Sequence, residues 1–133
     1  MAAITAVPTP HTKPVKFGNY AVDMTFICSV KVSAGQAVGL NAAGKLVVPA
    51  AGAAAIGAAL YAGEAEDEIA VRLNGVVAMF NGDGSTAIAP GASVAVGAFG
   101  GVVAGIANHI GISLEAIPGG AFGYVLLAQK AGA

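Results

Sequence analysis

The chain has very little charge. Only 10% of its 133 residues are Asp, Glu, Lys or Arg, and the formal net charge is −1. Its six basic residues form no cluster, so they do not provide the cationic face that nucleic-acid binding needs, and we expect no nucleic-acid partner. A surface rich in Ala, Gly and Val is unfavourable to expose to water, which favours contact with other protein chains.

Residues that build catalytic and metal sites are also scarce. The chain has one cysteine, Cys28, and two histidines, His11 and His109. A zinc site needs about four nitrogen or sulfur ligands at close spacings, and nucleophilic catalysis needs a base beside a Ser or Cys. The sequence suggests neither arrangement, so we expect no enzyme activity, no metal and no cofactor. We interpret Cys28 as a buried, inert thiol.

Most of the acidic residues lie in one run, Glu64–Glu68. Clustered carboxylates could bind a calcium ion, but the spaced ligand pattern of known calcium loops is missing. The favoured interpretation is therefore a solvated turn between two strands. Asp83 is expected in another exposed turn, where the pKa of a carboxyl group is ordinary.

Two uncharged stretches, Leu46–Gly63 and Ser85–Ala107, suggest membrane spans from hydropathy alone. Each contains a proline and several glycines, and its bulky residues alternate with small ones. That pattern favours β-strands with small side chains, so we expect no membrane segment. Met1–Thr12 has no apolar run, so no signal peptide is expected either.

The first 17 residues predict an extended segment. Pro8, Pro10 and Pro14 lack backbone donors and hold the residues before them extended. Two interpretations stay open: a disordered tail, or an arm that becomes ordered against a partner, for example by adding a strand to its sheet. We expect residues 18–133 to form a single β-rich domain, since the length fits one domain.

The remainder predicts an all-β fold with at most a short helical turn. Strands are expected over Ala21–Val32, Gln36–Leu40, Lys45–Val48, Ile56–Leu60, Ile69–Leu73, Val76–Phe80, Ala92–Val96, Val102-Val103, Ile110–Leu114 and Tyr124–Leu127. At Asn74-Gly75 a tight hairpin competes with a strand that bends at Gly75 and continues. Asn81–Ser85 is expected to be the tip of a loop.

The second half of the chain repeats the first. Identities fall at Gly35/Gly91, Val38/Val94, Gly44/Gly100, Val47/Val103, Ile56/Ile110, Gly57/Gly111, Leu60/Leu114, Val71/Val125 and Leu73/Leu127, after a two-residue shortening before Ile110. A repeat of this kind predicts two similar β units that bury each other's apolar faces. The expected architecture is a small antiparallel β-barrel or sandwich with an extended N-terminal arm.

Several motifs give the chain a resemblance to a known family. They are Ala34-Gly35, Ile56–Leu60, Asp67–Gly75, Pro90–Val94 and Ile110–Leu114. With them, roughly Tyr20 to Leu127 resembles the small capsid cement, or head decoration, proteins of tailed bacteriophages, a family once mislabelled as recombinase-like. The chain departs from the family where members often carry an acidic residue after the turn glycine, because it has Gln36 and Ala92 there. Its second unit also has Ala121-Phe122-Gly123 where the first has Asp67-Glu68-Ile69.

The resemblance implies a virion structural protein without catalysis, made in the host cytoplasm, that binds the outer surface of an assembled phage capsid. Its implied partners are the major capsid protein and itself, as a homotrimer. An N-terminal arm commonly contributes to the grip, which assigns capsid contact to Val7, Pro8, Pro10, Pro14, Val15 and Phe17. The alternatives are another virion structural subunit, such as a tail-tube protein, and a soluble ligand-binding β-barrel.

Overall fold

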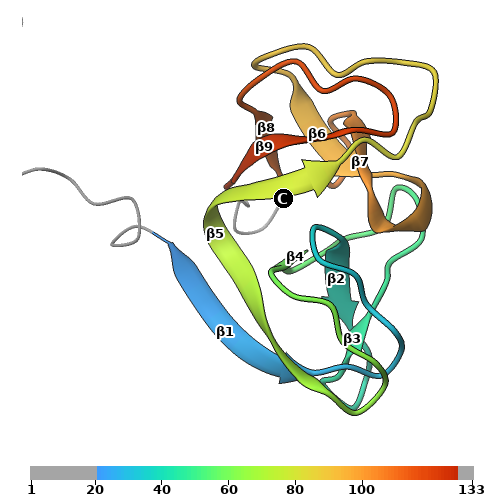
Figure 1. The fold of residues 1–133 in the computed structure, drawn as a ribbon, viewed down its shortest axis with the longest axis vertical. Coiled ribbons are helices and arrows are strands. Elements are labelled where there is room, and N and C mark those ends of the chain that lie inside the picture. The colour runs from blue at the N-terminus through green and yellow to red at the C-terminus, as the bar shows by residue number, and fades with distance from the viewer. Residues whose placement is uncertain (1–20, 129–133) are drawn as a thin grey trace, which may run out of the picture.

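The computed structural model describes residues 21–128, which contain nine β-strands and no α-helix (Figure 1). The strands are β1 (Val22–Ile27), β2 (Ala37–Leu40), β3 (Leu46–Val47), β4 (Gly57–Ala59), β5 (Glu68–Phe80), β6 (Ser93–Val96), β7 (Val102–Ala104), β8 (Gly111–Ser113) and β9 (Phe122–Leu127), with a 3-10 helix η2 (Ala98–Gly100) between β6 and β7. All strand pairs of these elements are antiparallel. The predicted all-β fold is confirmed.

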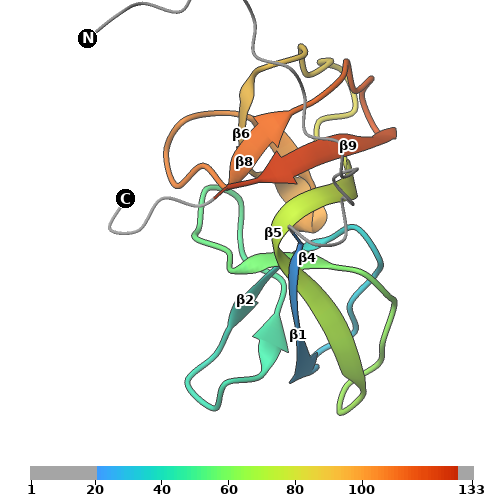
Figure 2. The ribbon, with the colours of Figure 1, turned by 90° about the vertical axis from the view of Figure 1, so that its left-hand side faces the viewer.

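The long strand β5 connects two similar units, as Figures 1 and 2 show. Unit 1 comprises residues 21–74, and the first half of β5 pairs with β1 and β4 there. Unit 2 comprises residues 75–128, and the second half of β5 pairs with β9 there. The strand order is β1-β5-β4-β2-β3 in unit 1 and β5-β9-β8-β6-β7 in unit 2, so the two orders match strand for strand.

Each unit curls toward a small barrel. Cys28, directly after β1, forms a parallel bridge with Leu46 of β3, and Asn81, directly after β5, forms one with Val102 of β7. These bridges join the first and last strands of each order. A curled sheet of this kind encloses side chains without needing a second layer.

Backbone pairing confirms the repeat predicted from the sequence. Val38 pairs with Gly57 in unit 1, and Val94 pairs with Gly111 in unit 2. A Cβ atom at Gly57 would collide with the carbonyl of Arg72, and one at Gly111 would collide with the carbonyl of Leu126. The same close approach of two strands therefore requires the glycine of the Ile-Gly pair in both units.

At Asn74-Gly75 the strand bends and continues, so the hairpin interpretation is wrong. β5 runs without interruption from Glu68 to Phe80, and Gly75 has a φ of +115°. A Cβ atom at Gly75 would lie 3.1 Å from the Cα of Ala21, where the described chain begins. Glycine accommodates both the unusual backbone conformation and the close neighbour.

Two apolar clusters fill the body. The cluster of unit 1 contains Cys28, Val32, Val38, Leu46, Ala59, Ile69 and Val71. The cluster of unit 2 contains Val77, Met79, Ile88, Val94, Val96, Val102, Ile110, Ile117, Val125 and Leu127, and it also includes Ala37, Ala55 and Ala58 of unit 1. The predicted mutual burial of the two units is therefore carried by small side chains of unit 1.

Two regions differ from the sequence-based expectation. The strand expected over Ala21–Val32 ends at Ile27, and Val22 and Met24 are exposed. Among the strands of residues 21–128, β1 pairs with β5 alone. Asn81, expected at a loop tip, is buried. Its amide donates to the carbonyls of Thr86 and Ile117 at 2.7 and 3.1 Å, and these bonds offset the loss of water.

Candidate interaction surface

An exposed apolar face lies on the outer side of β8 and β9. We call it the β8–β9 face, and its residues are Ile112, Leu114, Phe122, Tyr124 and Leu126. Phe122 is 61% exposed and Tyr124 is 57% exposed. In the register of the sheet, Leu126 of β9 lies opposite Ile112 of β8. Large apolar side chains on neighbouring strands form a patch of the kind that marks protein contacts.

The sequence of β9 explains why this face is apolar. Gly123, Val125 and Leu127 point into the body and are buried, while the intervening residues point outward. A strand with one wet face normally alternates apolar and polar residues, but β9 is apolar on both faces. Tyr124 and Leu126 lie in the strand predicted from the sequence, but the pattern alone does not show whether another segment covers them, and Phe122 falls outside the predicted range.

Phe122 also reaches the boundary between the two units. Its ring packs at the edge of the Phe80 ring, with 5.8 Å between the centroids. A Cβ atom at Gly35 of unit 1 would lie 2.7 Å from the Phe122 ring, so the ring covers that glycine. Next to it is an open pocket of about 360 Å³, lined by Leu60 and Arg72 of unit 1 and by Val76 and Tyr124 of unit 2, among others.

A polar network spans the bend of β5. Arg72 donates from Nε and Nη2 to the Asp23 carboxylate at 2.9 and 3.0 Å, and from Nη1 to the carbonyl of Val76 at 2.7 Å. The hydrogen bond and charge of Arg72 hold the pKa of Asp23 below its ordinary value. The guanidinium therefore ties β1 and both halves of β5 together on the outer face.

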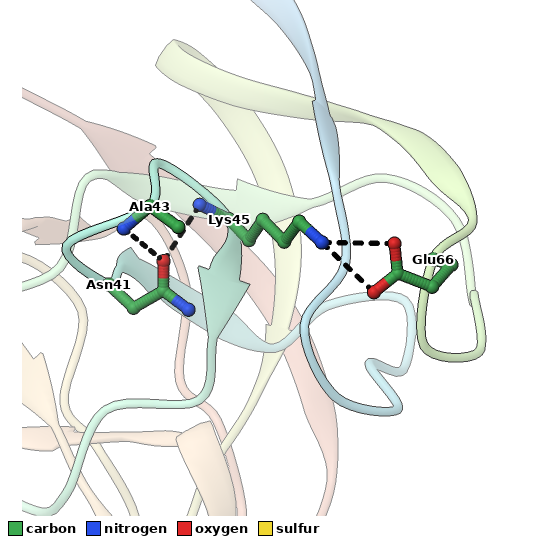
Figure 3. A network of polar contacts seen from close by, with 4 residues as sticks. All are labelled: Asn41, Ala43, Lys45 and Glu66. Atoms are coloured by element: carbon green, nitrogen blue, oxygen red, sulfur yellow. Dashed lines mark hydrogen bonds and ion pairs between the residues drawn. The ribbon is translucent and has the colours of Figure 1, made fainter.

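The acidic run Glu64–Glu68 is exposed, as predicted; it contains a turn and leads into β5, of which Glu68 is the first residue. Glu66 forms an ion pair with Lys45 of the β2–β3 hairpin, with Nζ 3.0 Å from both carboxylate oxygens (Figure 3). In the same hairpin, Asn41 Oδ1 accepts from the backbone N–H groups of Ala43 and Lys45. The ion pair links the hairpin to the turn, and the Asn41 bonds hold the loop of the hairpin itself. Within residues 21–128, no group of three His, Cys, Asp or Glu side chains is placed to hold a metal ion.

The remaining reactive side chains lie apart from one another. Cys28 is fully buried, as predicted, and burial, with a smaller contribution from the Asp67 charge, raises the pKa of its thiol. His109 contacts the carbonyl of Ile106 in the loop before β8. The pKa of Asp83 is lowered rather than ordinary, because its carboxylate accepts from Ser85 and Thr86.

The arm residues predicted to contact a capsid lie outside the described residues. They are Val7, Pro8, Pro10, Pro14, Val15 and Phe17. His11 and the C-terminal residues 129–133, which were not assigned to the contact, also lie outside the described residues. Among the described residues, no helix is long and apolar enough to cross a membrane.

Comparison with known proteins identifies a similar fold. Neither a scan of protein-family models nor a search of curated proteins gives a match. Among solved structures, the chain is similar to the N base of head fibre gp8.5 of bacteriophage phi29, with a TM-score of 0.67 and 15% sequence identity. The similarity covers 85% of this chain and 99% of that chain, so the two share their fold over nearly the whole of the fibre base.

Proposed function

We propose that the chain is a structural protein of a phage head that binds the outer surface of the assembled capsid as a cement or decoration protein. The observation that carries this proposal is the β8–β9 face, a large apolar surface on a body with few charged residues. Such a surface suits a protein that works inside an assembly. The fold of a phage head fibre base supports the same setting.

The role we propose needs no catalysis. Cys28 is fully buried, and within residues 21–128 no group of three His, Cys, Asp or Glu side chains comes together. A decoration protein acts instead through many modest contacts repeated over a lattice, where linked contacts gain strength without any single strong site. The partners we propose are the major capsid protein and further copies of this chain.

We assign the capsid contact to residues 1–17. The described chain begins at Ala21, beside the bend of β5 at Gly75. A chain of 17 residues can extend up to about 60 Å, which is enough to reach across neighbouring subunits. Its apolar and proline residues suit an extended segment that pairs with a partner's sheet edge.

The test compares the full chain with a variant that lacks residues 1–17. Purified protein is mixed with assembled heads of the phage that encodes it, and bound protein is measured by co-sedimentation. We expect the full chain to sediment with heads, and to be released before the major capsid protein on mild denaturation. The shortened variant should keep the far-ultraviolet circular dichroism of the full chain but remain in the supernatant.

Three results would contradict the proposal or part of it. Normal binding of the shortened variant to heads would show that residues 1–17 do not make the capsid contact. No binding by the folded full chain, together with assembly of the protein alone into tubes, would indicate a tail-tube subunit instead. A small molecule retained by a purified monomer that ignores heads would indicate a ligand-binding barrel.

A further inference from the structure

The two units contact each other through different surfaces. On the side of unit 1, Ala37, Ala55 and Ala58 belong to the core cluster of unit 2, and Leu60 packs against it. Unit 2 contributes other positions. The N–H of Gly52 donates to the carbonyl of Val96 at 2.9 Å, and the side-chain amide of Gln36 donates to the carbonyl of Phe99 at 2.8 Å.

The repeat shows where the equivalent surfaces lie. The unit 1 positions Ala37, Ala55, Ala58 and Leu60 correspond in the aligned strands and loops to Ser93, His109, Ile112 and Leu114 of unit 2. The unit 2 positions Val96, Phe99 and Phe122 correspond to Leu40, Ala43 and Glu68 of unit 1. These two sets share no member, so the contact at these positions is heterologous rather than self-complementary. The equivalent loops before β4 and β8 also meet, because Asn108 Nδ2 donates to the carbonyl of Gly52 at 3.0 Å.

For each of the two contacting surfaces, the equivalent surface on the other unit is therefore not used in the contact between the units. On unit 2, Ile112 is 41% exposed and Leu114 is 49% exposed, although their counterparts Ala58 and Leu60 are packed against the other unit. On unit 1, Leu40 is 42% exposed, although its counterpart Val96 is 1% exposed. The end units of repeat proteins normally carry polar outer faces. Here each face exposes large apolar side chains beside polar ones: Ile112 and Leu114 lie with Ser93 and His109, and Leu40 lies with Glu68.

We propose that a second copy of this chain docks the surface around its Leu40 onto the surface around Ile112 and Leu114. The contact reproduces between copies the contact that already joins the two units within a chain. A heterologous contact repeats head to tail, and it forms a ring when the rotation closes.

This contact assigns a partner to the β8–β9 face. It rests on the proposed function for its biological setting. A second copy is favoured because both complementary surfaces are present on every molecule and because their geometry continues an interface found within the chain. Ile112, the counterpart of the buried Ala58, carries a larger apolar side chain and is exposed, so it offers apolar surface for a second copy to cover.

The experiment uses the purified full-length chain without capsids, so it can fail independently of capsid binding. Molar mass is measured by light scattering and sedimentation over a range of concentrations. We expect the parent chain to associate, and Ile112→Arg or Leu40→Arg to weaken association by about 10-fold or more in the dissociation constant. Val30→Arg is the matched control, because Val30 is 42% exposed and belongs to neither surface.

Mixing the two surface variants tests the head-to-tail geometry. The Ile112→Arg chain keeps an intact Leu40 surface, and the Leu40→Arg chain keeps an intact Ile112 surface. An equimolar mixture should therefore form a heterodimer of one copy of each, at concentrations where each variant alone should associate much more weakly. A parent chain that stays monomeric at all concentrations overturns the proposal. An oligomer that both variants preserve, or a mixture that gives no heterodimer, also overturns it.

Discussion

At the scale of single residues, the two units fill one equivalent core site in opposite ways: the large side chain comes from a different position in each unit. In unit 1 a Cβ atom at Gly63 would lie 2.8 Å from the side chain of Ile69. In unit 2 the equivalent positions are reversed, with Ile117 where unit 1 has Gly63 and Gly123 where it has Ile69. One large and one small residue thus occupy each site, which keeps the packed volume nearly constant.

This exchange predicts strong coupling between the two positions of unit 2. Gly123→Ile alone should overpack the site and lower the free energy of unfolding by about 1–3 kcal/mol. Ile117→Gly alone should leave a cavity and lower it by about 3–5 kcal/mol. The double variant restores the arrangement of unit 1, so its loss should be smaller than the sum by more than about 1 kcal/mol.

Urea unfolding of the four proteins, with the parent slope as a check, measures this coupling. Strictly additive losses would show that the two residues do not share one space. Their pairing could not be predicted from the sequence, because the alignment of the repeat compares identical residues and these two positions differ. Asn81 was missed for a similar reason, since its burial depends on the carbonyl of Ile117, which is distant in sequence.

At the scale of elements, β5 determines how the two units are joined. The dipeptide Asn74-Gly75 is compatible with a tight hairpin or with a bend, and the local sequence does not distinguish them. Pairing decides the outcome. A hairpin at this point would fold the second half of β5 back on the first, along an edge where β1 or β4 already pairs. The bend instead lets the second half pair with β9, and Arg72 bonds across it to Val76.

We expect Gly75→Ala to destabilise the protein. The φ of +115° at Gly75 is unfavourable for any residue with a Cβ atom, and that atom would also press on Ala21. The free energy of unfolding should fall by about 1–3 kcal/mol. Gly84→Ala is the matched control, because a Cβ atom there has no neighbour within 4 Å and the backbone has no positive φ.

Thermal and urea unfolding of both variants provide the measurement. An unchanged Gly75→Ala midpoint would mean that the strand tolerates a straighter path at this point.

Most other strands could be predicted without knowledge of their pairing. Their alternating small and large residues between glycine turns were sufficient to predict β2, β6 and β8 to within a residue or two.

At the scale of the whole molecule, the repeat predicted the architecture but not the interface. Identities such as Val38/Val94 and Gly57/Gly111 fall at paired positions in both units, because the same strand contacts constrain them. Which outer face of unit 1 meets unit 2 is set by packing between distant segments. The β8–β9 face was missed for the same reason, since an apolar residue on a strand does not show by itself whether a neighbour covers it.

The shared core predicts that the two units unfold together. Because Ala37, Ala55 and Ala58 of unit 1 are part of the core cluster of unit 2, loss of one unit should expose the core of the other. Ile88→Ala, at a site that is 2% exposed in unit 2, should lower the free energy of unfolding by about 2–5 kcal/mol. The same loss should reach unit 1, although no atom of unit 1 changes.

Native-state hydrogen exchange of two matched amides tests this coupling. The N–H of Ala59 donates to the carbonyl of Gln36 in unit 1, and the N–H of Ser113 donates to that of Ala92 in unit 2, both at 2.9 Å. In the Ile88→Ala variant, the opening free energies of both amides should fall by the same amount. A fall at Ser113 with no change at Ala59 would show that the units open separately. Equal falls would instead mean that the two units open as one cooperative body, held together by β5 and by Ala37, Ala55 and Ala58. A rigid body of this kind holds the two surfaces of the head-to-tail contact in a fixed relation.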